Sequence, residues 1–148
     1  MNTRNSGFTL IELTVVLLIV VISFTAIGTN ISSGNQSAQL KAIARDLASA
    51  CRYARGQALI SHKEVAVAIN LAENSYQVSS RKKTYKFSDE IDITLVIAQD
   101  EFKGDDVAQV RFYADGSSSG GRITLEWENL AQIIDVNWLS GKVDISDE

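Results

Sequence analysis

The chain has 148 residues, of which 45% are hydrophobic and 22% are charged, a length and composition that suit one domain with a core of its own. The formal net charge of −4 argues against general nucleic-acid binding, because proteins that bind nucleic acid need a basic face. The single cysteine, Cys51, excludes an intramolecular disulfide.

The first predicted element is a membrane helix. Residues 1–7 are polar with one charge, Arg4, and residues 8–27 are apolar except for Glu12. Twenty helical residues rise about 30 Å, which matches the hydrocarbon core of a bilayer. The apolar run is longer than that of a secretory signal, and no small-residue cleavage site follows it. Arg4 before the span predicts a cytoplasmic N-terminus.

Glu12 is the unusual residue of this span. A carboxylate near one end of a hydrophobic helix costs a few kcal/mol or more to bury and usually has a partner. One interpretation places Glu12 near the membrane interface, where its carboxylate reaches water. The other pairs it with a positive group at the same depth, such as the α-amino group that a cut between Gly7 and Phe8 would create.

The junction itself resembles a known signal. The segment Ser6-Gly7-Phe8-Thr9-Leu10-Ile11-Glu12 is similar to the class III signal sequence of type IV pilins and type II secretion pseudopilins. This resemblance implies cleavage after Gly7 by a prepilin peptidase and N-methylation of Phe8. It also implies that Glu12 neutralises the amino terminus of a neighbouring subunit during assembly, and two opposite charges in a low-dielectric setting do attract strongly.

The helix is predicted to continue beyond the membrane to about residue 60. Residues 28–34 form helix poorly, so a bend or a melted turn is expected there, although the chain has no proline to mark it. Farther on, apolar residues recur at three- and four-residue spacing, which predicts an amphipathic helix packed on a domain. The members of this apolar stripe are Leu40, Ile43, Ala44, Leu47, Ala50, Cys51, Ala54 and Ala58.

After residue 61 the apolar period becomes two, which predicts strands. Segments rich in Gly, Asp and Ser supply the turns between them. A helix followed by consecutive short strands indicates an α+β fold with antiparallel sheets packed on the helix. The predicted strands lie at 65–69, 76–78, 91–97, 107–113, 122–128, 132–139 and 143–146.

Three segments of this part resemble the H-type minor pseudopilins (GspH), a family that shares its domain with the FimT/FimU minor pilins. They are the helix piece 46–58, the stretch 110–121 and the closing hairpin 136–143. The resemblance implies a type IV pilin-like fold. The expected organisation is a leader peptide at 1–7, a transmembrane helix at 8–30 and a periplasmic head at 31–148.

Other motifs carry weaker signals. Cys51 lies on the apolar stripe and is predicted to be a buried, inert thiol, so catalysis with His62, the one histidine, is not expected. The glycine- and serine-rich stretch 115–121 lacks the lysine of a phosphate loop and is predicted to be a hairpin. The acidic cluster Asp100, Glu101, Asp105 and Asp106 is predicted to be a solvated loop, with a calcium site as the alternative. The basic run 81–83 is predicted to be a solvated turn.

Together these features predict a minor pseudopilin, a structural subunit of the type II secretion pseudopilus that helps export folded proteins across the outer membrane. The alternative is a FimT/FimU-like minor pilin of a type IV pilus, involved in pilus assembly or DNA uptake. We expect no enzyme, no catalytic residue, no metal and no cofactor. The expected partners are other major and minor pseudopilins, the prepilin peptidase, the inner-membrane assembly platform and membrane lipid, with no nucleic acid. The expected location is the inner membrane, crossed once, with a cytoplasmic N-terminus and a periplasmic head.

Overall fold

The computed structural model describes residues 9–98, 101–103 and 106–147, and within these the side chains of 24–34 and 103 are left aside. The chain divides into two units, Met1–Gln36 and Ser37–Glu148. We call the second unit the head. Over the described residues, no helix meets the length and hydrophobicity needed to cross a membrane.

Helix α1 (Leu10–Ser61) is a single element of 52 residues, as the sequence predicted. Its backbone stays helical through 28–34, so the melted turn expected there is not found. The helix ends where His62 adopts a φ of 51°, the left-handed conformation that commonly follows a helix C-terminus. Histidine is among the residue types that enter this region more readily than most.

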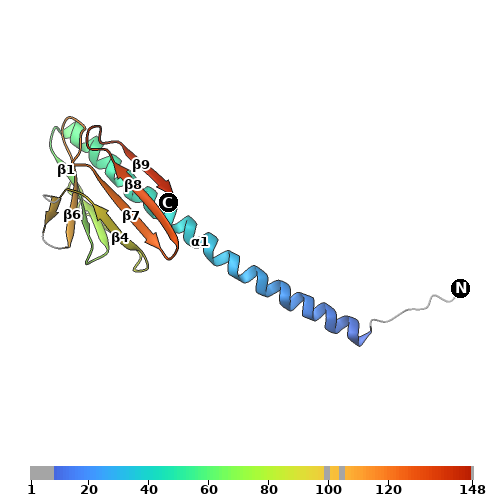
Figure 1. Ribbon diagram of the computed structural model, residues 1–148. Coiled ribbons are helices and arrows are strands. Elements are labelled where there is room, and N and C mark those ends of the chain that lie inside the picture. Colours follow the sequence, from blue (N-terminus) through green and yellow to red (C-terminus); the bar gives the residue numbers. More distant parts are fainter. Residues whose placement is uncertain (1–8, 99–100, 104–105, 148) are drawn as a thin grey trace. The chain divides into compact units, whose positions relative to one another are not determined.

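Among the described residues of the head, nine strands form two antiparallel sheets (Figure 1). The five-stranded sheet has the order β3-β2-β1-β6-β5 and the four-stranded sheet has the order β4-β7-β8-β9. The bounds are β1 Val65–Asn70, β2 Ser75–Val78, β3 Thr84–Lys86, β4 Asp92–Val96, β5 Phe102–Lys103, β6 Val107–Phe112, β7 Gly121–Trp127, β8 Leu130–Val136 and β9 Val143–Asp147. This architecture confirms the predicted α+β class.

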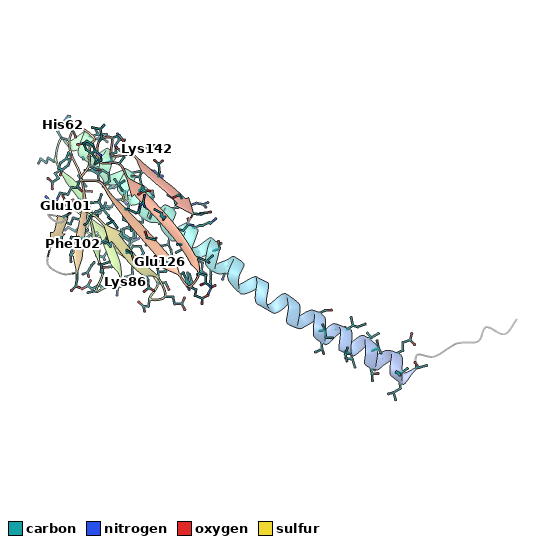
Figure 2. The ribbon with its side chains drawn as sticks, viewed as in Figure 1. His62, Lys86, Glu101, Phe102, Glu126 and Lys142 are labelled. Atoms are coloured by element: carbon teal, nitrogen blue, oxygen red, sulfur yellow. The ribbon has the colours of Figure 1, made fainter. Side chains whose placement is uncertain are left out.

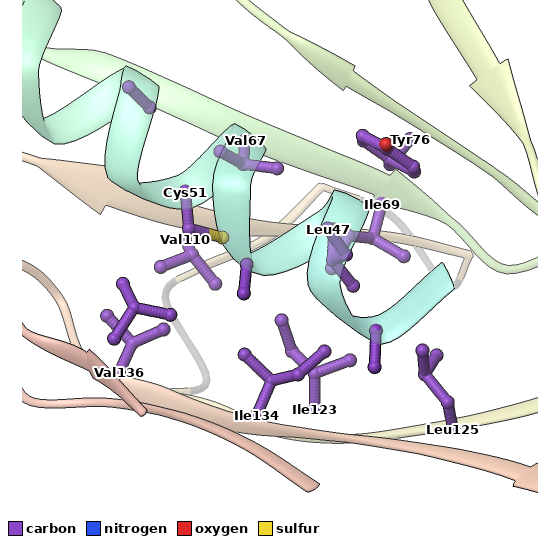
Figure 3. Packing of buried hydrophobic residues seen from close by; sticks show 14 of the residues in the cluster. Leu47, Cys51, Val67, Ile69, Tyr76, Val110, Ile123, Leu125, Ile134 and Val136 are labelled. Atoms are coloured by element: carbon purple, nitrogen blue, oxygen red, sulfur yellow. The ribbon is translucent and has the colours of Figure 1, made fainter. Parts of the chain in front are cut away.

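The core of the head lies between the helix and the two sheets. Figure 3 shows Leu47 and Cys51 of α1 flanked by residues of the five-stranded sheet on one side and of the four-stranded sheet on the other. The helix is fully buried at six members of the stripe and at Ala48, which was not predicted; the seven residues are Leu40, Ala44, Leu47, Ala48, Cys51, Ala54 and Ala58. Four of these seven are alanines, whose small side chains let both sheets approach the helix backbone closely. The predicted stripe is confirmed, with Ile43 and Ala50 at its partly buried edge.

Three strand predictions need correction. The short edge strands β3 and β5 were not predicted, and β8 begins at Leu130 instead of Gln132. Trp127 pairs directly with Leu130, so only two residues, Glu128 and Asn129, turn the hairpin, and Glu128 takes a φ of 54°. A two-residue turn with positive φ fits the strand twist, but no glycine marks it in the sequence. At its other end β8 stops at Val136, so Trp138 and Leu139, which the predicted strand included, lie in an exposed turn.

Candidate functional site

The start of α1 holds the one predicted site residue that the structure describes. Glu12 lies in the first helical turn and is exposed. Its backbone N–H donates a hydrogen bond of 3.3 Å to Thr9 Oγ1, and the N–H of Leu13 donates to the Thr9 carbonyl at 3.2 Å. Thr9 is therefore the N-cap of the helix. Gly7 and Phe8, the predicted cleavage and methylation sites, lie outside the described residues.

Sequence reasoning missed the capping role of Thr9. The signal was present, because Thr9 and Glu12 have the spacing of a capping box directly before an apolar run. A carboxylate in the first turn is also favoured by the partial positive charge at the helix N-terminus. Glu12 is thus compatible with the helix start even before any charged neighbour reaches it.

The following turns of α1 expose apolar side chains on every side. The hydroxyls of Thr14 and Ser23 fit this apolar surface because each is hydrogen-bonded within the helix. Thr14 Oγ1 donates to the Ile11 carbonyl and Ser23 Oγ to the Ile19 carbonyl, each at 2.8 Å. Such a surface is stable in lipid or against other apolar helices. The exposed residues are Leu10, Ile11, Leu13, Val15, Val16, Leu17, Leu18, Ile19, Val20, Val21 and Ile22.

In the head, two arginines join α1 to the loop that follows β6 and to the start of β9. Arg55 Nε donates to the Gly116 carbonyl at 3.0 Å, and Arg52 Nη2 donates to the Val143 carbonyl at 2.9 Å. The loop that follows β6 also bonds to the loop that follows β8, through Ser118 N to the Trp138 carbonyl at 2.8 Å. We call this contact between residues 52–55, 115–121 and 137–143 the loop junction.

The loop junction explains the glycine- and serine-rich stretch. Asp115 accepts hydrogen bonds from both the backbone N–H and the hydroxyl of Ser117, and these bonds lower the pKa of the Asp115 carboxyl. Gly116 and Gly120 have φ values of 86° and 73°, which glycine adopts without strain. The predicted hairpin was wrong, because β6 belongs to the five-stranded sheet and β7 to the four-stranded sheet, so this stretch is a connection that crosses from one sheet to the other.

Cys51 and His62 occupy different environments. Cys51 is fully buried, and burial raises the pKa of its thiol to about 12, so the reactive thiolate is scarce at neutral pH. His62 is exposed just beyond the end of α1. The interpretation of Cys51 as a buried thiol is confirmed.

The acidic cluster differs from the predicted solvated loop at Glu101. This residue is only 7% exposed and its carboxylate accepts a 2.7 Å hydrogen bond from Arg111 Nε. Arg111 also pairs with Glu64 at 3.0 Å, so it joins two acidic groups. Arg111 belongs to β6, the neighbour of β5, which explains why Glu101 turns inward. Asp100 and Asp105 lie outside the described residues, within which no group of three His, Cys, Asp or Glu is placed to hold a metal.

Comparison with sequence models of known families shows to which family this chain is related. The sequence model of the family described as type II transport protein GspH matches residues 44–140, and so includes most of the loop junction. The chain belongs to the GspH family. A second model, the prokaryotic N-terminal methylation motif, matches residues 2–28. The GspH family and this motif together indicate a membrane-anchored protein with a periplasmic head.

Individual relatives agree with the GspH assignment. The type II secretion system protein H of Xanthomonas campestris pv. campestris is 22% identical over 137 residues, which cover 93% of this chain and 80% of the relative. The minor pseudopilin EpsH of the Vibrio cholerae type 2 secretion system superposes with a TM-score of 0.58 at 8% identity, over 73% of this chain and 96% of EpsH. The type IV minor pilin FimU of Pseudomonas aeruginosa gives 0.57 at 9% identity, over 75% and 90%. At these identities the two structures establish the fold alone.

Proposed function

We propose that this GspH-family chain is a minor pseudopilin, a structural subunit of the type II secretion pseudopilus that helps export folded proteins across the outer membrane. The observation that carries the proposal is the joint match of the GspH family to the head and of the methylation motif to the N-terminus. Its direct partners are other pseudopilins. The role is structural, without catalytic residue, cofactor or nucleic acid.

The anchor is the N-terminal part of α1. In this proposal residues 8–30 cross the inner membrane once, which leaves the N-terminus cytoplasmic and residues 31–148, which include the head, periplasmic. The apolar residues exposed on every side of the first turns support this role, as do the internally bonded hydroxyls of Thr14 and Ser23. A prepilin peptidase cuts between Gly7 and Phe8, Phe8 is then N-methylated, and the inner-membrane assembly platform adds the subunit to the fibre.

Glu12 has the assembly role in this scheme. Cleavage places an amino group on Phe8, about one helical turn from Glu12. In the fibre the same carboxylate pairs with the amino group of an adjacent subunit, which fixes the axial register of the two helices. The pairing offsets the free-energy cost of a carboxylate within the membrane.

The first prediction concerns this pairing. Glu12→Val removes the charge but keeps a helix that inserts, is cleaved and carries a folded head, because none of these steps requires the carboxylate. We expect N-methylated Phe8 in mass spectra of the membrane-extracted variant. Cross-linking to other pseudopilins and secretion are expected to fall at least tenfold, because an uncompensated positive amino group is left in the membrane.

Thr14→Val is the matched control, because it introduces the same side chain into the next turn without changing charge. Normal cross-linking and secretion by Glu12→Val would eliminate charge pairing from the mechanism. An intact Met1, or a cut elsewhere than after Gly7, would instead contradict the processing step.

The alternative function is that of a type IV pilus minor pilin. The fold does not distinguish the two functions, because FimU and EpsH superpose with nearly the same TM-score. A FimT/FimU-like minor pilin would have the same anchor and would act in pilus assembly or DNA uptake. The family match and the secretion-system relative favour the pseudopilus. Deletion of the gene distinguishes the two, because loss of protein secretion with normal pilus extension supports the pseudopilus and the reverse supports the pilus.

A further inference from the structure

The β2–β3 hairpin concentrates positive charge on an otherwise acidic chain. Four of the fourteen Lys and Arg residues, Arg81, Lys82, Lys83 and Lys86, lie between positions 81 and 86, whereas the whole chain has a net charge of −4. All four are exposed, as the predicted solvated turn requires. We call residues 81–86 the basic hairpin.

The basic hairpin lacks acidic partners within the part of the chain that the structure describes. The ion pairs found there involve Lys41, Arg111, Arg122 and Lys142, and none of the four cations of the hairpin. Two of these cations instead lie over aromatic rings. The Arg81 guanidinium is 3.6 Å from the ring centroid of Tyr53, and Lys83 Nζ is 4.6 Å from that of Tyr85. Arg81 Nη1 also donates a 3.5 Å hydrogen bond to the Tyr85 hydroxyl. Neither an aromatic ring nor a neutral hydroxyl cancels the positive charge, so an external anion can still pair with these side chains.

A pocket of about 310 Å³ adjoins the basic hairpin. Its aromatic wall is a stacked pair, Tyr76 and Tyr85, with ring centroids 5.0 Å apart and planes inclined by 11°. Tyr53 lines the helix side, and Arg81 of the hairpin, whose guanidinium lies over the Tyr53 ring, also lines the pocket. Polar side chains, Asp46 and Ser49, line the pocket beside these rings. Rings fixed in this way offer a rigid contact surface at low entropic cost, and tyrosine and arginine are enriched among the residues that dominate binding energy.

We propose that the basic hairpin and the tyrosine pocket form one docking surface for an acidic segment of a partner protein. Carboxylates of that segment pair with Lys82, Lys83 and Arg81, and one of its apolar side chains enters the pocket. Charge complementarity selects this occupant, because the hairpin presents unpaired positive charge beside a pocket large enough for a single side chain. The proposal goes beyond the anchor and the fibre role, and it holds for a pseudopilin or a pilin alike.

An acidic protein fits this surface better than a nucleic acid. Affinity for a polynucleotide requires cations spread along several phosphates. Here the positive charge is confined to one hairpin, Asp46 lines the pocket, and Asp89 and Glu90 follow β3 within a few residues. These carboxylates interrupt the run of positive charge that an extended phosphate backbone needs. A short peptide avoids them by placing its carboxylates at the hairpin and an uncharged side chain in the pocket.

The distribution of tyrosines allows a direct test. The chain has four tyrosines, of which Tyr53, Tyr76 and Tyr85 line the pocket and Tyr113 does not. The full chain in detergent is labelled with 3-fluorotyrosine and titrated with a twelve-residue peptide in which glutamates flank one central leucine. We expect the fluorine resonances of the three pocket tyrosines to shift while that of Tyr113 stays in place, and we expect affinity to fall with added salt.

Variants separate a specific surface from general charge attraction. Lys82→Gln with Lys83→Gln is expected to weaken peptide binding at least fivefold. The matched control, Lys41→Gln with Lys142→Gln, removes the same charge from side chains that pair with Asp147 and Asp144 of the other sheet, and is expected to bind normally. Replacing the central leucine of the peptide by glycine is expected to reduce the shifts of Tyr76 and Tyr85.

Three outcomes would overturn the proposal. One is the absence of any shift in the pocket resonances, and another is equal weakening by the hairpin variant and its control. The third is tighter binding of a dodecathymidylate probe than of the acidic peptide, which would assign the surface to nucleic acid.

Discussion

Gly141 lies in the turn between β8 and β9 with a φ of 62°, a left-handed conformation that L-residues with a side chain rarely adopt. A Cβ at this position would collide with the Gly116 carbonyl oxygen and with the Arg55 side chain. Arg55 donates its hydrogen bond to that same carbonyl. A single hydrogen atom in place of a side chain thus lets the loop junction close.

Gly141→Ala is predicted to destabilise the protein by about 2–4 kcal/mol, from backbone strain together with overpacking. Chemical denaturation monitored by circular dichroism measures the loss. Gly56→Ala is the matched control, because a Cβ there meets nothing within 4 Å and the residue lies inside α1. That control is expected to gain about 0.5–1 kcal/mol from helix propensity. Equal stability of the two variants would refute the steric account.

Between elements, β9 is joined to α1 and β8 by one carboxylate. Asp147 accepts a 2.6 Å hydrogen bond from Gln132 Nε2 and a 2.9 Å hydrogen bond from Lys41 Nζ. The bond from Gln132, and then that from Lys41, lowers the pKa of Asp147 below its ordinary value of 3.8. The folded protein therefore binds this proton more weakly than the unfolded chain does. The stabilisation is present above pH 3.8 and is lost as the pH falls through the lowered pKa.

The corresponding prediction uses Asp147→Asn. The melting temperature of the variant should lie below that of the wild type at pH 7, and the difference should shrink as the pH falls below 3.8, where the wild-type carboxyl also becomes neutral. Melting curves between pH 2 and pH 7 provide the measurement. Asp144→Asn is the control, because Asp144 lies on the same strand and its ion pair is with Lys142, two residues away in the sequence. A constant difference across the pH range would exclude this linkage.

Sequence periodicity predicted the elements whose burial is one-sided and regular. The stripe of α1 and the alternation of β4, β6 and β7 belong to this class. In β1 the apolar alternation of Val65, Val67 and Ile69 was also readable, although Ala66 on the opposite face is buried as well. The edge strands β3 and β5 span three and two residues, which is too short for an alternation of apolar and polar residues to be recognised in the sequence. The start of β8 was misplaced because Glu128 turns the chain without a glycine.

Sites formed by residues that lie far apart along the chain were not predicted from the sequence. The T-x-x-E spacing of Thr9 and Glu12 is local and was readable. By contrast, the tyrosine pocket joins Tyr53 of the helix to Tyr76 and Tyr85 of two strands, and no spacing along the chain indicates that they meet. Glu101 likewise looked solvated because its partner, Arg111, lies on a strand whose register only folding establishes.

At the scale of the molecule, the head contains the whole buried cluster. Every member of this cluster lies between Leu40 and Val143, within the unit Ser37–Glu148. Figure 2 shows His62 and Lys142 at one end of the head and Lys86 and Glu126 at the other, with side chains dense between them. The head thus has all the apolar contacts that a cooperative fold needs.

A truncated chain that begins at Asn30 is therefore predicted to be soluble and to unfold in one cooperative transition. In that chain Leu47→Ala should cost about 2–5 kcal/mol, because Leu47 is fully buried between the sheets. Thermal and denaturant unfolding test both statements. Leu139→Ala is the control, since Leu139 is 67% exposed and its truncation should change little. Aggregation of the truncated chain, while the full chain is well folded, would contradict the prediction.

The order of the elements along the chain also determines when the core of the head can form during synthesis. The ribosome makes the stripe of α1 first, but Ile123, Leu125, Ile134 and Val143, which cover one side of it, come from the last quarter of the chain. Until these strands emerge from the ribosome, one side of the apolar stripe is exposed to solvent. The contacts that cover it join residues far apart in the sequence, and such contacts form slowly. Completion of the head must therefore wait for release of the C-terminal residues, and the unfinished chain is open to aggregation and to chaperone capture during that interval.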